Sequence, residues 1–338
     1  AFLPTNQFGG FLRTYLMIKF IDLFCGLGGF RVALESWGCE CVFSSDIDKY
    51  ARETYKENFG EYPTGDITVI DEKDIPDHDI LCAGFPCQPF SIGGKRLGFE
   101  DTRGTLFFDV LRILKEKRPA AFFLENVAGL CNHDGGKTID TIIGCLKDIG
   151  YVPIFKVINA KDVGYPQNRA RWYCVGFDKT RFPNITEDYD FPFPTKKNLK
   201  YTIDSLIDDE VSEDYIVTKT CKENIAAHVQ EFMNSGRYDS NHVLIANEVR
   251  KSRCNFRCDG ISPCLTAKMG TGGNNVPVVV SKDRKLTERE CLRIMGYPDS
   301  YKIKENFYQS YKQIGNSVIV PIVKDISEKL VKILKEQL

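Results

Sequence analysis

The sequence lacks any run of about 18 apolar residues, and no charged-then-apolar segment stands at its start. We therefore expect neither a membrane span nor a secretory signal. Histidine is scarce, with four residues, and the 13 cysteines form no regular framework. Cys254 and Cys258 are the one close pair considered for zinc, and no second close pair follows them. We expect a metal-free protein of a reducing compartment, with most cysteines in the core.

An excess of one charge is also missing from the chain as a whole, whose formal net charge is −1. One segment departs from this balance: from Arg250 to Lys285, eight basic residues stand against two acidic ones. Nucleic-acid binding depends on local patches rather than on total charge. On charge alone, this segment is equally consistent with a phosphate-contacting surface and with a solvated loop.

Short apolar strands alternate with helical stretches over the first half of the chain. We expect helices at about 29–37, 105–117 and 138–149, and strands at 19–24, 41–45, 79–83, 120–124, 152–158 and 171–177. This alternation predicts an α/β fold with a doubly wound, mostly parallel sheet. Ligands bind such sheets at the carboxyl ends of the strands.

The regular alternation stops near Arg181, where three prolines follow within 14 residues, so a domain boundary is expected between 180 and 200. Residues 201–285 are expected to be irregular. Helical patterning resumes at 286–295 and again from Val320 to the end. Residues 1–16 precede Met17 and the first strand, and we expect them to be a leader or a remnant of cloning.

A glycine-rich turn, Gly26-Leu27-Gly28, follows the first expected strand and lets the backbone approach a ligand closely. The full dinucleotide fingerprint is absent, because Arg31 stands in place of its third glycine. Asp46 ends the next strand, where a carboxylate binds ribose hydroxyls or caps a helix. Together these features favour a nucleoside-bearing cofactor. Asp66 and Ile67 could border its adenine or simply form a turn.

Cys87 lies between Pro86 and Pro89 at the end of an expected strand. The prolines restrict the backbone, which suits a nucleophile that must be held on target. A thiolate is a strong nucleophile, although a buried structural cysteine is the plainer interpretation. The glycine-rich, basic loop 93–98 could close over an anionic substrate or lie on the surface as an ordinary loop.

Glu125 ends another expected strand and could hydrogen-bond and protonate a ring nitrogen, which requires a pKa raised by desolvation. The alternative is a helix-capping acid. Arg169 and Arg171 would point the same way along an extended strand and could clamp a carboxylate or a phosphate. Their alternative is ordinary surface charge.

Taken together, these motifs resemble the bacterial DNA cytosine-5 methyltransferase family, and within it the HhaI-type enzymes. The motifs stand in the family's order and at its separations. They occupy residues 20–31, 84–91, 125–127, 167–171, 290–298 and 313–318. The resemblance implies a sequence-specific DNA cytosine-C5 methyltransferase with a Rossmann-like fold. Its cofactor would be S-adenosyl-L-methionine and the product S-adenosyl-L-homocysteine.

The resemblance also implies a division of the chain. Residues 17–198 would form the catalytic, cofactor-binding domain, and 199–285 a smaller, irregular target recognition domain. Residues 286–338 would form a hinge and return to the catalytic domain. In the recognition segment the match is reduced to fragments at 260–266 and 269–277.

Site residues follow from the same resemblance. The catalytic set would be Cys87, Glu125, Arg169 and Arg171. The cofactor would be bound by Phe24, Gly26, Gly28, Asp46, Ile47, Asp66, Ile67, Gly84, Pro86, Leu106, Asn316 and Val318. DNA would be bound by Gln88, Ser91, Lys95, Arg96, Arg250, Arg253, Arg257, Leu265 and Thr266.

Three positions depart from the family pattern. Cys264 precedes Leu265 where many relatives have threonine, Asp46 replaces a longer glutamate, and Ile47 replaces an aromatic residue. The first departure could alter a contact to the target, and the other two could alter cofactor affinity.

The implied partner is double-stranded DNA, bound by a monomer in the bacterial cytosol or nucleoid. A cognate restriction endonuclease could belong to the same system without forming a stable complex. Three other functions stay open: a tRNA cytosine methyltransferase, an NAD-linked oxidoreductase, and a catalytically silent DNA-binding homologue. The recognition sequence cannot be deduced from residues 199–285, because loops contact bases in a context-dependent way.

Overall fold

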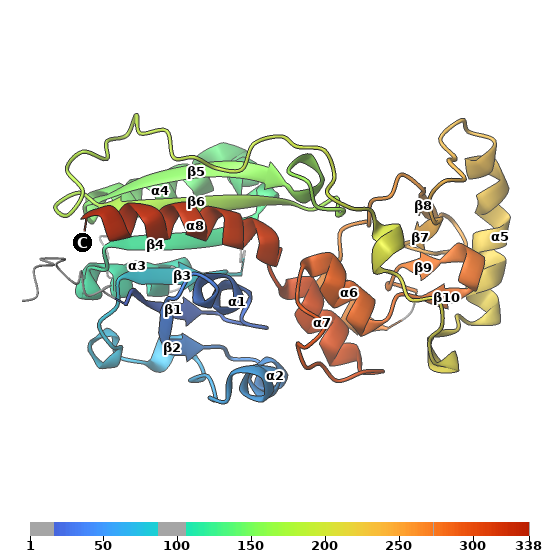
Figure 1. Cartoon of the computed structure of the whole chain (residues 1–338), viewed down its shortest axis with the longest axis horizontal. Coiled ribbons are helices and arrows are strands. Elements are labelled where there is room, and N and C mark those ends of the chain that lie inside the picture. Colours follow the sequence, from blue (N-terminus) through green and yellow to red (C-terminus); the bar gives the residue numbers. More distant parts are fainter. Residues whose placement is uncertain (1–16, 87–105, 273, 338) are drawn as a thin grey trace, which may run out of the picture.

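The computed structural model describes residues 17–86, 106–272 and 274–337. In Figure 1 these residues form two lobes, one around a six-stranded sheet and one around a four-stranded sheet. Within this described part of the chain, no helix is long and apolar enough to span a membrane. The expected leader, residues 1–16, lies outside the described residues. So do five predicted site residues: Cys87, Gln88, Ser91, Lys95 and Arg96.

Six strands build the larger sheet: β1 (Lys19–Leu23), β2 (Glu40–Ser45), β3 (Ile80–Ala83), β4 (Ala121–Val127), β5 (Tyr151–Asn159) and β6 (Ala170–Asp178). Their order is β2-β1-β3-β4-β6-β5. The first four are mutually parallel, whereas β6 is antiparallel to both β4 and β5. The reversal follows from the short connection between β5 and β6, since an antiparallel pair needs no crossover helix.

Helices cover both faces of this sheet: α1 (Gly29–Glu35), α2 (Lys49–Phe59), α3 (Leu106–Lys117), α4 (Lys137–Asp148) and α8 (Val320–Gln337). Side chains alternate across β4, so Phe123 packs in one core with α1 and α8. Its neighbour Phe122 packs in a second core with α3 and α4. The predicted doubly wound, mostly parallel α/β fold is therefore confirmed.

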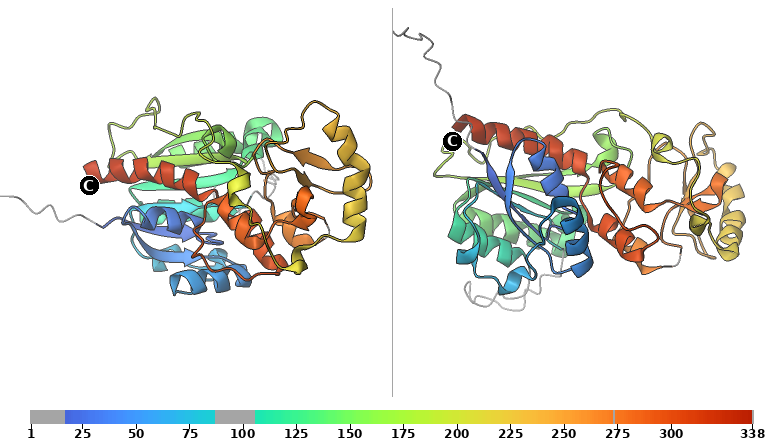
Figure 2. Two further views of the ribbon diagram at one scale, coloured as in Figure 1. Left: turned by 45° about the vertical axis from the view of Figure 1, so that its right-hand side comes forward. Right: turned by 60° about the horizontal axis from the view of Figure 1, so that its bottom comes forward.

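The C-terminal helix α8 returns to the larger lobe and packs beside α1, as Figures 1 and 2 show. Two hydrogen bonds join the helices at the end of α1. The Trp37 indole donates to the Lys324 carbonyl at 3.1 Å, and the Lys335 amine donates to the Trp37 carbonyl at 3.3 Å. The larger lobe is thus completed by residues from both ends of the described chain.

The smaller lobe contains helix α5 (Lys219–Met233) and four short strands, β7 (Ile245–Asn247), β8 (Asn255–Arg257), β9 (Val278–Val279) and β10 (Arg284–Lys285). The strand order is β10-β9-β7-β8, and each pair is antiparallel. The expected smaller and largely irregular second part of the fold is therefore present, but its short antiparallel sheet and α5 were not predicted. Strands of two or three residues are too short for a visible alternation, and α5 buries a narrow stripe that includes Cys221, Ile225 and Phe232.

Two further helices, α6 (Glu288–Met295) and α7 (Tyr308–Asn316), stand between the lobes in Figure 1. The patterning expected at 286–295 corresponds to α6, which begins after a capping box formed by Thr287 and Glu290. Sequence patterning assigned no helix to α7, although the motif from Gln313 to Asn316 lies within it.

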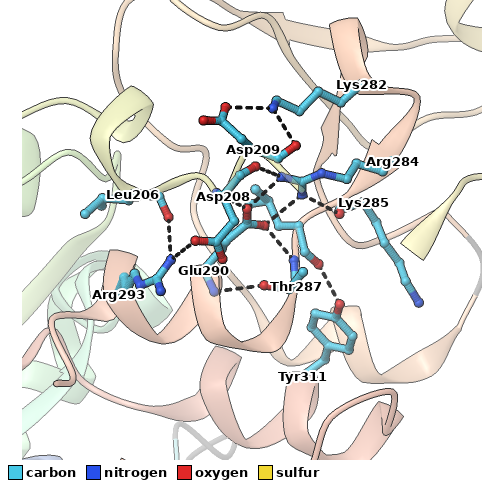
Figure 3. Close-up of polar contacts among 11 residues, drawn as sticks. Leu206, Asp208, Asp209, Lys282, Arg284, Lys285, Thr287, Glu290, Arg293 and Tyr311 are labelled. Atoms are coloured by element: carbon cyan, nitrogen blue, oxygen red, sulfur yellow. Dashed lines mark hydrogen bonds and ion pairs between the residues drawn. The ribbon is translucent and has the colours of Figure 1, made fainter. Parts of the chain in front are cut away.

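A buried ion pair joins the smaller lobe to α6 (Figure 3). The Arg284 guanidinium contacts both carboxylate oxygens of Glu290, at 2.7 and 2.9 Å. Their side chains are 3% and 0% exposed. Arg284 also donates to the Asp208 carbonyl, and Glu290 accepts from the backbone N–H groups of Asp208 and Thr287. Three segments thus meet at one pair of opposite charges.

Breaking this pair should destabilise the protein strongly. Glu290→Ala leaves the Arg284 charge buried without its acid, so we expect the free energy of unfolding to fall by about 3–5 kcal/mol. Urea denaturation measures the change. Glu328→Ala, which removes the acid of an exposed pair with Lys329, is the matched control and should cost about 1 kcal/mol or less. Equal losses in the two variants would contradict the assignment.

Candidate active site

A cleft of about 700 Å³ opens at the carboxyl ends of β1 to β4. This volume is within the range of small-molecule and cofactor sites, and its place at the strand ends is where α/β sheets bind ligands. Ten of the residues predicted to bind a cofactor line it: Phe24, Gly26, Asp46, Ile47, Asp66, Ile67, Gly84, Pro86, Leu106 and Asn316.

The two remaining predicted cofactor residues, Gly28 and Val318, are not part of this lining. Gly28 has φ +68°, and a Cβ there would lie 2.5 Å from the Phe59 ring. Val318 is buried, and its side chain lies 2.5 Å from the place of a Cβ on Gly29. Gly28 packs on the Phe59 ring and Val318 packs on Gly29, so these contacts argue for a packing role.

Asp46 organises the mouth of the cleft through backbone contacts. Its carboxylate accepts from the Gly26 N–H and from the Asp48 N–H, each at 2.8 Å. The alternative that Asp46 caps a helix was wrong, because Asp48 caps α2 by accepting from the N–H groups of Tyr50 and Ala51. Burial raises the pKa of Asp46, and the two backbone donors oppose that shift.

Ile47 is 73% exposed although it is apolar, and it stands beside Asp46 in the cleft. Asp66 also lines the cleft, and its carboxylate caps a short turn by accepting from the N–H and hydroxyl of Thr68. Asp66 therefore does form the turn that the sequence left open as an alternative. One cleft lined by an exposed apolar side chain and two carboxylates is chemically suited to a nucleoside, which has a flat base and ribose hydroxyls.

Glu125 and Arg171 form an ion pair in the inner part of the cleft, with 3.2 Å between Nε and Oε1. β4 continues past its expected end at Leu124, so Glu125 lies within a strand opposite Tyr173, and the helix-cap alternative was wrong. The pair is not aligned as a hydrogen bond, and Oε1 has no hydrogen-bond partner among the described residues. Burial raises the pKa of Glu125, while Arg171 and Arg169 oppose the shift.

Arg169 is 2% exposed, so the surface-charge alternative was wrong for it. Its guanidinium donates to the carbonyls of Leu265 at 2.5 Å, Gly315 at 3.2 Å and Ser317 at 2.6 Å. Burial, helped by the neighbouring Arg171, lowers the pKa of this guanidinium. Both terminal nitrogens of Arg169 thus donate to backbone carbonyls. This makes Arg169 a positioning residue rather than a clamp for a free phosphate.

Leu265 must be removed from the predicted DNA-contacting set. Its side chain is completely buried in the main core, so it cannot reach a DNA surface, and its carbonyl instead accepts from Arg169. Its neighbour Thr266 is exposed and begins a short helix, η7 (Ala267–Thr271). The family-like fragment therefore combines one structural residue with one accessible residue.

Several basic side chains of the segment 250–285 already have partners within the protein. Arg253 pairs with Glu248 at 3.0 Å, and Arg257 pairs with Asp259 at 2.5 Å. Arg284 is the buried partner of Glu290 and cannot contribute to a phosphate surface. The third predicted DNA residue of this segment, Arg250, donates to the side chain of Asn275 and to nearby carbonyls.

Other residues line the cleft without having been assigned a role: Ser45, Asp48, Ala51, Gly65, Thr68, Phe85, Asn126, Val127, Lys312, Gln313 and Gly315. Most of them neighbour a predicted residue in the chain, so a search around each motif could have found them. Asn126, for example, donates to the Phe85 carbonyl at 2.9 Å and joins the ends of β4 and β3. Lys312 directly precedes the motif at 313–318, but its contact with Asp48 joins distant segments and could not be deduced from the sequence.

Comparison with known proteins gives a consistent result. The family model described as C-5 cytosine-specific DNA methylase matches residues 18–332. The Type II methyltransferase M.HhaI of Haemophilus parahaemolyticus is 44% identical over 315 residues, which cover 92% of this chain and 93% of that protein. The Type II methyltransferase M.NgoBI of Neisseria gonorrhoeae is 45% identical over 309 residues, or 91% of each chain.

Solved structures share the fold at lower identity. A DNMT2 mutant of Spodoptera frugiperda has a TM-score of 0.66 and 23% identity, covering 93% of this chain and 99% of its own. A putative DNA modification methyltransferase encoded within an Escherichia coli prophage has a TM-score of 0.69 and 22% identity, with coverages of 94% and 99%. At these identities the likeness supports the fold alone.

The raised pKa of Glu125 should appear in the pH dependence of stability. Above the ordinary value of 4.5, the unfolded chain has released a proton that the folded state still binds. The free energy of unfolding should therefore fall as the pH rises from 4.5 through the raised pKa. Urea denaturation between pH 4.5 and about pH 8 measures this slope, which Glu125→Gln should reduce. The same slope in both proteins would contradict a raised pKa.

Proposed function

The chain belongs to the C-5 cytosine-specific DNA methylase family and is a DNA (cytosine-5-)-methyltransferase, and from this premise we propose how its residues divide the work. Target cytosine is flipped out of the duplex, Cys87 attacks carbon 6, and carbon 5 receives a methyl group from S-adenosylmethionine. The observation that carries the proposal is the position of the Glu125–Arg171 pair in the same cleft as Asp46 and Ile47. A base and a nucleoside-bearing cofactor could thus meet in one cavity.

The cleft fits S-adenosylmethionine in size and in chemistry. Asp46 would bind the ribose hydroxyls, and the exposed Ile47 and the Asp66 turn would border the adenine. The backbone of the glycine turn and Asn316 would hold the amino-acid end. When bound, the cofactor supplies a sulfonium-activated methyl group, and its product is S-adenosylhomocysteine.

Cys87 lies outside the described residues, but Pro86 directly before it lines the cleft. Its thiolate would form a bond to carbon 6, and the electron pair of the 5,6 double bond would make carbon 5 nucleophilic. After the methyl group is accepted, carbon 5 gives up its proton to solvent. The electron pair then re-forms the double bond and expels the Cys87 thiolate.

Glu125 would donate its proton to ring nitrogen 3 during the attack and recover it when the ring is restored. A raised pKa favours the protonated carboxyl, which is the form that can donate a proton. Arg171, beside it, would donate to the cytosine carbonyl and orient the base. Oε1 of Glu125 lies beside Arg171 but has no aligned hydrogen-bond donor among the described residues, which suits a ligand contact because an unsatisfied buried oxygen is costly.

We propose residues 17–198 as the catalytic domain, 199–285 as the target recognition domain and 286–338 as the returning segment. Duplex DNA would lie against the recognition lobe, contacted by Thr266, Arg250, Arg253 and Arg257. Gln88, Ser91, Lys95 and Arg96 would contribute from the loop after Cys87. The enzyme would act as a monomer in the bacterial cytosol or nucleoid, alongside a cognate restriction endonuclease in a restriction-modification system.

The nucleophile can be tested by base-resolution methylation of unmodified duplex DNA. Wild type should methylate cytosines within one short sequence, and Cys87→Ala should methylate none, because no other thiolate would attack carbon 6. Duplex DNA with 5-fluorocytosine at the target should trap a covalent complex, since carbon 5 then has no proton to lose. Methylation of tRNA in place of duplex DNA would contradict the proposed substrate, and an active Cys87→Ala would contradict the nucleophile.

The proton donor can be tested in the same assay. Glu125→Gln keeps the shape but cannot transfer a proton, so kcat should fall by about 10²–10⁴-fold. Cofactor binding, measured by calorimetry, should be retained. Glu57→Gln, on an exposed part of α2, is the matched control and should leave kcat unchanged. A Glu125→Gln enzyme within about threefold of wild type would overturn the assignment.

A further inference from the structure

Lys312 lies on α7, the helix that forms one wall of the cleft. Its amine donates to the Asp48 carboxylate at 2.8 Å, across the mouth of the cleft. Gln313, the next residue, accepts from the Thr54 hydroxyl at 2.9 Å. Helix α7 therefore contacts α2 at two adjacent points, one of them an ion pair.

Asp48 connects this ion pair to the predicted ribose-binding acid. One oxygen of its carboxylate caps α2, and the other accepts from Lys312. The backbone N–H of Asp48 donates to Asp46 at 2.8 Å, and the Gly26 N–H donates to the other oxygen of Asp46. The Asp46 carboxylate thus accepts from the backbone of Asp48, and the side chain of Asp48 in turn accepts from Lys312.

Charge supports the same arrangement. Asp46 and Asp48 are close enough for the Asp48 charge to raise the pKa of Asp46. Lys312 lowers the pKa of Asp48 and balances its charge. A neutral side chain at 312 would leave two neighbouring carboxylates facing the cleft without that cation.

The backbone of Lys312 is itself held from the recognition side. Gly270, in η7, packs so closely on α7 that a Cβ there would lie 2.5 Å from the Lys312 Cβ and 2.7 Å from the Tyr308 carbonyl oxygen. Direct contact between the two backbones limits movement of α7 away from η7. The backbone of Lys312 is therefore held in place, and its amine donates to Asp48 from that position.

We propose that Lys312 is a positioning residue for the nucleoside part of the cofactor, acting through Asp48 on Asp46. The inference rests on the proposed function, because it takes Asp46 as the ribose-binding group. It predicts that Lys312 contributes to affinity for any adenosine-bearing ligand, whether or not the ligand has an amino-acid group. A direct contact between Lys312 and the cofactor carboxylate would instead require that group.

Calorimetry with two probes separates these roles: S-adenosylhomocysteine, and methylthioadenosine, which lacks the amino-acid group. Lys312→Met should bind both about fivefold more weakly, the scale of one partly exposed ion pair. Lys312→Arg, which keeps the charge, should recover most of the affinity. In the methylation assay, the loss should appear in KM for S-adenosylmethionine more than in kcat. A loss confined to S-adenosylhomocysteine, or no loss, would overturn the proposal.

Two further variants complete the test. Lys329→Met removes a lysine of similar exposure whose ion pair also measures 2.8 Å, but on α8 away from the cleft, and should leave both affinities unchanged. Asp48→Asn retains a helix cap but loses the charge. Lys312→Met should then add no further loss in the Asp48→Asn background, and full additivity would count against the pathway.

The proposed function is judged separately on wild type. If the wild-type protein binds neither probe, both the proposed function and the proposed role of Lys312 are contradicted. If it binds both and methylates DNA while Lys312→Met is indistinguishable from it, the inference about Lys312 alone is lost.

Discussion

The Arg169 guanidinium is the contact on which the geometry of the cleft depends. It joins the start of β6 to three carbonyls from two segments far along the chain, at Leu265 and at Gly315 and Ser317. Hydrogen bonds from a charged donor contribute about 1.5–3 kcal/mol each, and burial keeps water from competing for them. Loss of this one side chain would leave three buried carbonyls without the hydrogen-bond donor that they now share.

The same strand couples this support to the chemical groups. Arg171 follows Arg169 by two residues, and both residues line the cleft. Register with β4 then places Arg171 next to Glu125. Two guanidinium groups oppose the effect of burial on one carboxyl, and burial is the larger influence, so the pKa of Glu125 stays raised. One short run of sequence, from Arg169 to Arg171, thus both holds distant backbone segments and limits the rise in the pKa of Glu125.

Sequence patterns located the residues whose position follows from a strand end. Asp46 and Glu125 were found because a buried apolar run precedes each, and the sheet brings such ends together. Prediction from the sequence failed for residues whose position depends on contacts between distant segments. Leu265 was predicted to contact DNA, yet its side chain is buried in the core and its carbonyl accepts from Arg169. Lys312 was not predicted, because its ion pair with Asp48 joins segments that are far apart in the sequence.

The charges of the smaller lobe show the same limit. Composition gives a basic segment, but its arginines have acidic or carbonyl partners that the sequence alone could not assign. Exposed pairs such as Arg253–Glu248 contribute about 1 kcal/mol or less, so a phosphate can replace the carboxylate at small cost. The buried pair Arg284–Glu290 is different. If Arg284 left Glu290 to bind a phosphate, the Glu290 charge would stay buried without a partner. Burial therefore divides the basic residues into those that can be released to a polyanion and those that hold the lobe together, and the former would make binding depend on salt.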